Sequence, residues 1–134
     1  MILPNGTLVA VADGAALKLF RNRGAEPHID LVACDTPHIV SKNSGSGAHH
    51  RQGSANPDSD RSAEDDFAAA VADHLNHLAL DGSLDRVFLI ADPRTLGEIR
   101  RHIHPQLAGR IVGELPKDLT AHPIGDIANA IRHA

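Results

Sequence analysis

Aromatic residues and cysteine are scarce in this sequence. There is no Trp and no Tyr, and the three Phe are Phe20, Phe67 and Phe88. All three fall in predicted strands or on the core-facing side of a predicted helix, so a surface that stacks exposed bases on aromatic rings is excluded. The single Cys34 excludes an internal disulfide and a cysteine-based zinc cluster, because both need a second thiol. We therefore expect a protein of a reducing compartment.

Long apolar runs are also missing. None approaches the roughly 18–20 residues that span a bilayer, and residues 1–6 lack the basic and apolar regions of a secretory signal. The 134 residues, 42% of them apolar, suit one domain with one core. A formal net charge of −4 favours solubility over general nucleic-acid binding. We expect a soluble cytoplasmic protein of a single domain, residues 1–134, with no membrane partner.

The first quarter of the chain has the pattern of three strands. Residues 7–13 are rich in Val and Leu and end at Asp13-Gly14, a turn signal of the hairpin type. Residues 15–21 alternate between apolar and polar side chains, and residues 28–35 alternate again after a turn-forming stretch. This pattern predicts a meander of three strands in which neighbours are antiparallel.

A segment with almost no apolar residues follows, from residue 36 to residue 61. It is rich in Ser, Gly, Asn, Asp and His. Loops longer than about 12–15 residues are uncommon in compact domains and are usually functional or disordered. We predict a long flexible loop with two alternative roles. It reaches a phosphate-rich cleft through Arg51, Gln52 and Gly53, or it is an unstructured tether between the sheet and the next helix.

The remaining chain alternates helices and strands. A capping-box-like start at Ser62 precedes a helix whose apolar stripe ends near Asp81. The apolar run 86–91 is typical of a strand buried on both faces, and Asp92-Pro93 begins a helix over residues 94–102. A short helical piece at 105–109, a strand at 110–115 and a helix at 123–133 complete the chain.

The resulting order is β-β-β-α-β-α-β-α. It predicts an α/β fold with a mixed five-stranded sheet and helices on its faces, in which the first, fourth and fifth strands are parallel. This is the element order of the ribonuclease H-like fold. Because unrelated functions occur on one fold, the order by itself assigns no chemistry.

Two acidic residues lie at the ends of predicted central strands. Asp13 and Asp92, joined by Glu64 or Asp65 from the first helix, could hold Mg²⁺ for phosphodiester cleavage. The alternative is structural: Asp before Gly is typical of a turn, and Asp before Pro is typical of a helix N-cap. We favour the structural role, and we expect no metal, no cofactor and no enzymatic activity. If there is catalysis, the candidates are Gln52, Asp13 and Asp92.

Histidine is abundant, with ten residues, and the closely spaced pairs suggest zinc. The pairs are His74 with His77 and His102 with His104. No third ligand follows either pair at a fixed spacing, so we expect packed or hydrogen-bonded histidines. The serines of the 36–61 segment lack a nucleophile-elbow motif, and we do not expect serine hydrolysis.

A locally basic stretch contrasts with the acidic chain around it. Between residues 86 and 110, five Arg stand against Asp92 and Glu98, a net charge of 5 − 2, or +3. Arg94, Arg100, Arg101 and Arg110 are candidates for binding RNA or another polyanion. The alternative is a solvated helix face.

Three stretches together resemble a known family. VAVADGA at residues 9–15, DPRTLGEIR at 92–100 and ELPKDLT at 114–120 are similar to the signature regions of the bacterial host-attachment protein family. Its members are described as "protein required for attachment to host cells". The family is regarded as a distant relative of the central domain of archaeal and eukaryotic class-1 peptide-release factors, which is ribonuclease H-like.

The resemblance implies a role in translation. In those release factors, the loop before the first helix carries Gly-Gly-Gln, whereas this sequence has His50-Arg51-Gln52-Gly53 and lacks the preceding glycine pair. We therefore expect no peptidyl-tRNA hydrolase activity. The first hypothesis is an RNA- or ribosome-binding factor with ribosome or tRNA as partner. Its nucleic-acid contacts are Arg51, Gln52, Gly53, Arg94, Arg100, Arg101, Arg110 and Lys117.

Two other hypotheses stay open. The family description, taken literally, suggests an interaction protein that is indirectly required for attachment to host cells. The third hypothesis is a metal-dependent nuclease that uses Asp13 and Asp92.

Overall fold

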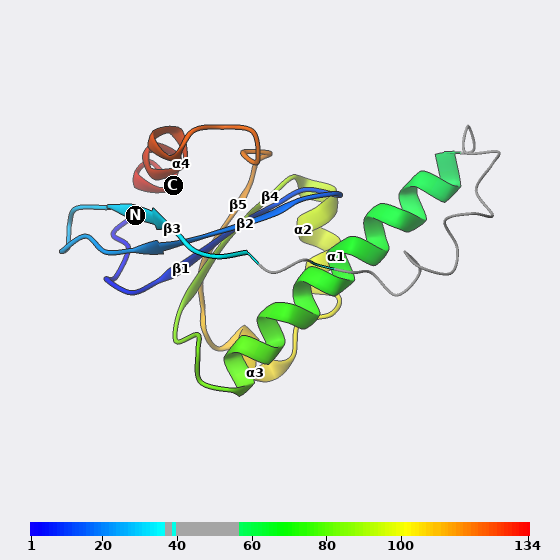
Figure 1. Ribbon diagram of the computed structural model, residues 1–134, viewed down its shortest axis with the longest axis horizontal. Helices are drawn as coiled ribbons and strands as arrows, with labels where there is room; N and C mark the ends of the chain where they lie inside the picture. The colour runs from blue at the N-terminus through cyan, green and yellow to red at the C-terminus, as the bar shows by residue number, and fades with distance from the viewer. Residues whose placement is uncertain (37–38, 40–56) are drawn as a thin grey trace.

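A five-stranded mixed sheet forms the centre of the molecule, in the strand order β3-β2-β1-β4-β5 (Figure 1). The computed structural model describes residues 1–36, 39 and 57–134. The elements follow one another as β1 (Leu8–Ala12), β2 (Leu17–Asn22), β3 (Leu31–Ala33), α1 (Pro57–Leu80), β4 (Val87–Ala91), α2 (Pro93–Arg100), α3 (Pro105–Ala108), β5 (Ile111–Pro116) and α4 (Ile124–Arg132).

The strand directions are those that the sequence predicts. β2 is antiparallel to both β1 and β3, whereas β1, β4 and β5 are parallel to one another. In the register of β1 with β4, Ala12 lies opposite Ala91. The predicted α/β fold with a mixed five-stranded sheet and helices on its faces is confirmed. Its assignment as ribonuclease H-like continues to rest on the element order.

The sheet divides the apolar interior into two clusters, where the chain length suggested one core. Every residue of β1 and β4 is buried, and alternate side chains along a strand point to opposite faces. Leu8, Leu89 and their neighbours pack with α1, α2 and α3. Val9, Ile90 and their neighbours pack with α4 on the other face. Figure 1 shows α4 alone on its side of the sheet.

Asn22 is a fully buried polar residue at the end of β2. Its Nδ2 donates to the carbonyl oxygens of Leu3 and Pro4, at 3.0 and 3.3 Å. Its Oδ1 accepts from the backbone N–H of Gly24 and of Asp30, at 3.0 and 2.9 Å. Because a buried amide is costly unless its hydrogen bonds are made, this residue holds the N-terminal segment and the β2–β3 turn in one arrangement.

The helix α1 begins at Pro57, so the expected start at Ser62 is wrong and the predicted loop 36–61 is too long at its C-terminal end. Proline fits the first turn of a helix. The sequence hid these turns because they lack an apolar stripe. Figure 1 shows that this end of α1 extends past the sheet. Within the described ranges, no helix is both long and apolar enough to cross a membrane.

The strand β3 is shorter than predicted. Only Leu31–Ala33 pairs with β2, although the alternation in the sequence covers residues 28–35. Part of the reason is that the N–H of Asp30 is bound by the Asn22 side chain.

Replacing Leu75 tests the cluster under α1. Leu75 is fully buried in the middle of the helix, so Leu75→Ala should lower the free energy of unfolding by about 2–5 kcal/mol. Leu80→Ala is the matched control, because Leu80 is 55% exposed on the same helix. It should change stability by less than about 0.5 kcal/mol. Urea denaturation of both variants makes the measurement, and equal effects would contradict the packing described.

Candidate functional site

The carboxyl ends of β1, β4 and β5 meet at one edge of the sheet, because the three strands are parallel. Asp13 follows Ala12 and Asp92 follows Ala91, two residues that lie opposite each other in the sheet. The segment 117–120 follows β5 at the same edge. We call the residues Asp13, Asp92 and 117–120 the carboxyl edge. Ligand sites of open α/β sheets lie at such edges.

Asp13 is engaged in the turn between β1 and β2. Its Oδ1 accepts from the backbone N–H of Ala15 and of Ala16, at 2.8 and 2.7 Å. Its Oδ2 accepts from Thr120 Oγ1 at 2.9 Å. The predicted structural role of Asp13 is confirmed. The contact with Thr120 joins the first strand to the end of the last one, which sequence spacing did not reveal.

The hydrogen bonds to Asp13 lower the pKa of its carboxyl group. Partial burial acts to raise the pKa of this carboxyl, but the hydrogen bonds from Ala15, Thr120 and Ala16, together with the charge of Lys18, outweigh burial. The net result is that the pKa of the Asp13 carboxyl lies below its ordinary value. Asp13 is therefore held as a carboxylate, a stable acceptor and a poor proton donor at neutral pH.

Thr120 lies between two carboxylates. Its Oγ1 is 2.9 Å from Asp13 Oδ2 and also 2.9 Å from Asp118 Oδ1. Thr120 is 7% exposed, so its hydroxyl is a buried link within the carboxyl edge. Asp118 and Thr120 belong to the KDLT stretch. Asp13 and Thr120 are 107 residues apart in the chain, so the sequence did not reveal their contact.

Asp92 is the N-cap of α2, as its position before proline predicted. Its Oδ2 accepts from the N–H of Thr95 at 3.1 Å, and its carbonyl accepts the first helical bond from Leu96. Capping of this kind stabilises a helix by about 1 kcal/mol. Asp92 thereby sets the position of α2 without needing a ligand.

The two proposed third carboxylates point to different partners. Glu64 packs against the Asp13-Gly14 turn so closely that a Cβ added to Gly14 would be 2.7 Å from Glu64 Cγ. Asp65 forms an ion pair with Arg94 at 3.0 Å. Among the residues that the structure describes, no three His, Cys, Asp or Glu side chains form a group suited to a metal ion. This geometry offers no support for the nuclease hypothesis.

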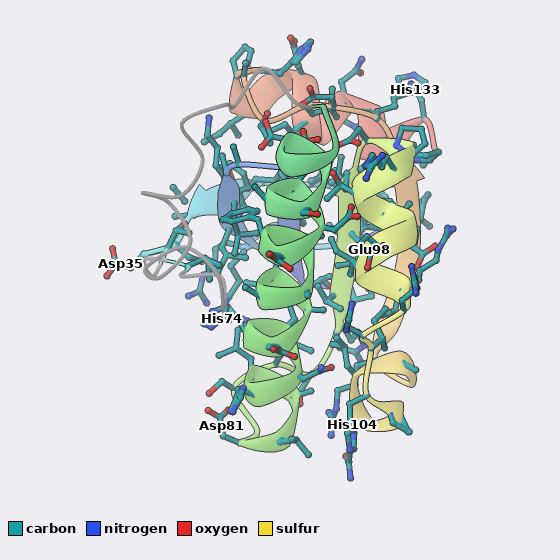
Figure 2. The ribbon with its side chains drawn as sticks, turned by 90° about the vertical axis from the view of Figure 1, so that its right-hand side faces the viewer. Asp35, His74, Asp81, Glu98, His104 and His133 are labelled. Atoms are coloured by element: carbon teal, nitrogen blue, oxygen red, sulfur yellow. The ribbon has the colours of Figure 1, made fainter. Side chains whose placement is uncertain are left out.

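Each arginine of the basic stretch 94–110 that we named as a candidate has a carboxylate partner. The pairs are Arg94 with Asp65, Arg100 with Glu114, Arg101 with Glu98 and Arg110 with Asp85. Glu98 also contacts His102, at 3.2 Å, and Figure 2 shows it on α2, beside α1. In the folded structure, these carboxylates therefore largely neutralise the excess positive charge counted along the sequence.

The histidine pairs have local partners. Partial burial, followed by the nearby His77, lowers the pKa of His74, and Asp81 acts in the opposite direction. His102 contacts Glu98, and His104 Nδ1 accepts from Gln106 N–H at 3.1 Å as the N-cap of α3. Figure 2 places His74 and Asp81 along α1 and His104 near α3. The expected packed or hydrogen-bonded histidines are confirmed for these residues.

Three of the predicted nucleic-acid contacts lie outside the described residues: Arg51, Gln52 and Gly53. The remaining candidate, Lys117, lies directly after β5. Its neighbours form an open groove of about 470 Å³ between the segment 115–122 and one face of α4. The polar groove residues on the α4 side, Asp126, Asn129 and His133, were not among the sequence-predicted site residues. The spacing of residues along a helix does not show which of them line a groove.

The fold is an α/β domain with helices on both faces of a mixed sheet. The model of bacterial archaeo-eukaryotic release factor family 12 matches residues 6–131. The chain belongs to this family, and the predicted relationship to release factors is confirmed. No curated protein matches the chain. A role in host attachment stays a prediction.

Replacing Asp13 tests its role in the turn through pH. The carboxylate has a lowered pKa when folded, so its contribution is complete above the unfolded pKa near 3.8 and is lost as pH falls through the lower folded value. Asp13→Asn should cost about 1 kcal/mol at pH 7, because the carboxyl is only partly buried and water weakens its bonds. The cost should shrink below pH 4.

Urea midpoints at pH 7, 4 and 2.5 make this measurement. Asp35→Asn is the matched control, since Asp35 is exposed, and its effect should be near zero throughout. A cost of Asp13→Asn that is independent of pH would contradict the assigned role.

Proposed function

We propose that this protein is an RNA- or ribosome-binding factor associated with translation, without peptidyl-tRNA hydrolase activity. The observation that carries the proposal is the match of the release factor family over residues 6–131. Relatives of release factors are expected to meet RNA, and the proposed partner is the ribosome or tRNA. The protein would work in the cytoplasm.

The exposed arginines of α2 are compatible with this role despite their ion pairs. The side chains of Arg94, Arg100 and Arg101 are 43, 55 and 75% exposed. Exposed ion pairs contribute only about 0–1 kcal/mol. A phosphate can therefore replace the carboxylate partner at a small cost in free energy. The guanidinium can then form two parallel hydrogen bonds to the phosphate. The pairs hold the arginines in place until an RNA backbone arrives.

The absence of hydrolysis is supported by sequence. Residues 50–53 read His-Arg-Gln-Gly in place of a glycine pair before glutamine. Glycine reaches backbone conformations that histidine and arginine rarely adopt. In addition, Asp13 and Asp92 are committed to a turn and to a helix cap, so neither is a convincing general base.

Co-sedimentation with ribosomes tests the proposal. The unmutated protein should pellet with ribosomes at low salt, and Arg100→Ala/Arg101→Ala and Arg51→Ala/Gln52→Ala should each reduce the bound fraction by about 3- to 10-fold. The control is Lys18→Ala/Arg23→Ala, which removes two exposed positive charges from β2 and the turn after it and should change binding less than 2-fold. Failure of the unmutated protein to associate at low salt would overturn the proposal.

A further inference from the structure

Lys117 lies in a groove, as Arg110 does at another site, but it differs from the arginines of the basic stretch in its charge partners. The segment after β5 forms one wall of this groove and α4 forms the other. Among the described residues, no carboxylate lies within ion-pair distance of the Lys117 ammonium, whereas Arg94, Arg100, Arg101 and Arg110 each have one. An unpaired ammonium in a concave site is better placed to take a phosphate than a paired guanidinium on a convex helix.

The α4 wall carries polar groups at regular spacing. Asp126, Asn129 and His133 lie three and four residues apart, so they share one face of the helix. The eight residues from Asp126 to His133 extend about 10 Å along the axis. All three side chains are exposed. The wall is therefore as long as one nucleotide with its phosphate.

The two histidines of the groove have defined hydrogen-bonding states. His133 Nδ1 lies 2.8 Å from the carbonyl oxygen of Asn129, which can only accept, so Nδ1 carries a proton. His122 Nδ1 lies 3.3 Å from Asp126 Oδ2, and the same reasoning applies when that carboxylate is ionised. In both rings the second nitrogen, Nε2, is left for a ligand. The contact with His122 occupies one oxygen of the Asp126 carboxyl group.

The lining of the groove is apolar in part. Leu119 is buried, and Leu115 and Ala130 are partly buried and pack on the α4 side of the core. Such a surface suits one face of a planar heterocycle. Asn129 adds a side-chain amide, whose adjacent donor and acceptor match the edge of a base. Each part of a nucleotide thus has a counterpart in the groove: Lys117 for the phosphate, the apolar lining for the face of the base, and Asn129 for its edge.

We infer that the groove between the segment 115–122 and α4 holds one nucleotide of a single-stranded RNA, with Lys117 on its phosphate and Asn129 on the edge of its base. This inference rests on the proposed RNA-binding function and gives it a site. It also places the principal RNA contact on the α4 face of the sheet, away from the arginines of α2. Without aromatic rings, the base is held by aliphatic contact and the amide.

Fluorescence anisotropy with a labelled single-stranded RNA hexanucleotide tests the inference. Lys117→Ala should weaken binding about 5-fold and lower the magnitude of the salt slope by about 0.7, the loss of one phosphate contact. Asn129→Ala should weaken binding about 3-fold with an unchanged salt slope, because the amide is neutral. Both residues are exposed, so the melting temperature of each variant should match that of the unmutated protein.

Lys18→Ala is the matched control, since it removes an equal charge from an exposed position on β2. Its effect on RNA binding should stay below 2-fold. Equal losses for Lys18→Ala and Lys117→Ala would show attraction by net charge only and would overturn the inference. Unchanged binding in both groove variants, or no saturable binding of the hexanucleotide up to 1 mM, would overturn it as well.

Two further results separate this inference from related ones. Competition by a nucleoside monophosphate as strong as that by the hexanucleotide would make the groove a mononucleotide site and overturn its role for RNA. Lys117→Ala and Asn129→Ala could leave both ribosome association and hexanucleotide binding unchanged. That result would rule out the groove as an RNA site and leave the proposed function standing. Hexanucleotide binding that depends on the groove, in a protein that does not associate with ribosomes, would rule out the ribosome as partner and leave the RNA site standing.

Discussion

The complete burial of β1 and β4 is the constraint on which the rest of the structure depends. All residues of both strands are covered, by α1, α2 and α3 on one face and by α4 on the other. Neither strand carries a polar side chain, so the first positions open to polar chemistry are Asp13 and Asp92, directly beyond them. The location of the carboxyl edge follows from the core.

Local hydrogen bonding then decides what the edge residues do. Asp13 accepts from a turn and from Thr120, and Asp92 accepts from the first turn of α2. Carboxylates used in this way stabilise the local backbone. Polar surface that is still free for a ligand therefore lies farther along, in the groove beside α4.

The fold could be predicted largely from periodicity, whereas the site could not. Alternation and apolar runs located all five strands, and the Asp92-Pro93 pair located the start of α2. The first turns of α1 escaped because Pro57, Asp58 and their neighbours have no apolar stripe. Helices that extend beyond a core need none, so pattern alone underestimates their length.

The site depends on contacts between residues far apart in the chain, and sequence spacing carries little information about them. The arginines of the stretch 94–110 counted as a positive patch along the chain. In the structure Arg94 meets Asp65 and Arg100 meets Glu114. Among the predicted contacts that the structure describes, Lys117 and Arg110 each line an open groove, and Arg110 is paired with Asp85 whereas Lys117 has no such ion pair. Charge along a chain and charge on a surface are different quantities.

The length of α1 has a mechanical consequence. Its 24 residues make a rod of about 36 Å, roughly twice the span of the five-residue strands it covers. The buried residues of α1 that pack on the sheet lie between Ala68 and Ala79, and the N-terminal part of the helix extends past the sheet (Figure 1). Because α1 is one continuous helix, any tilt of the packed part would move the N-terminal end of the helix farther than the packed part itself.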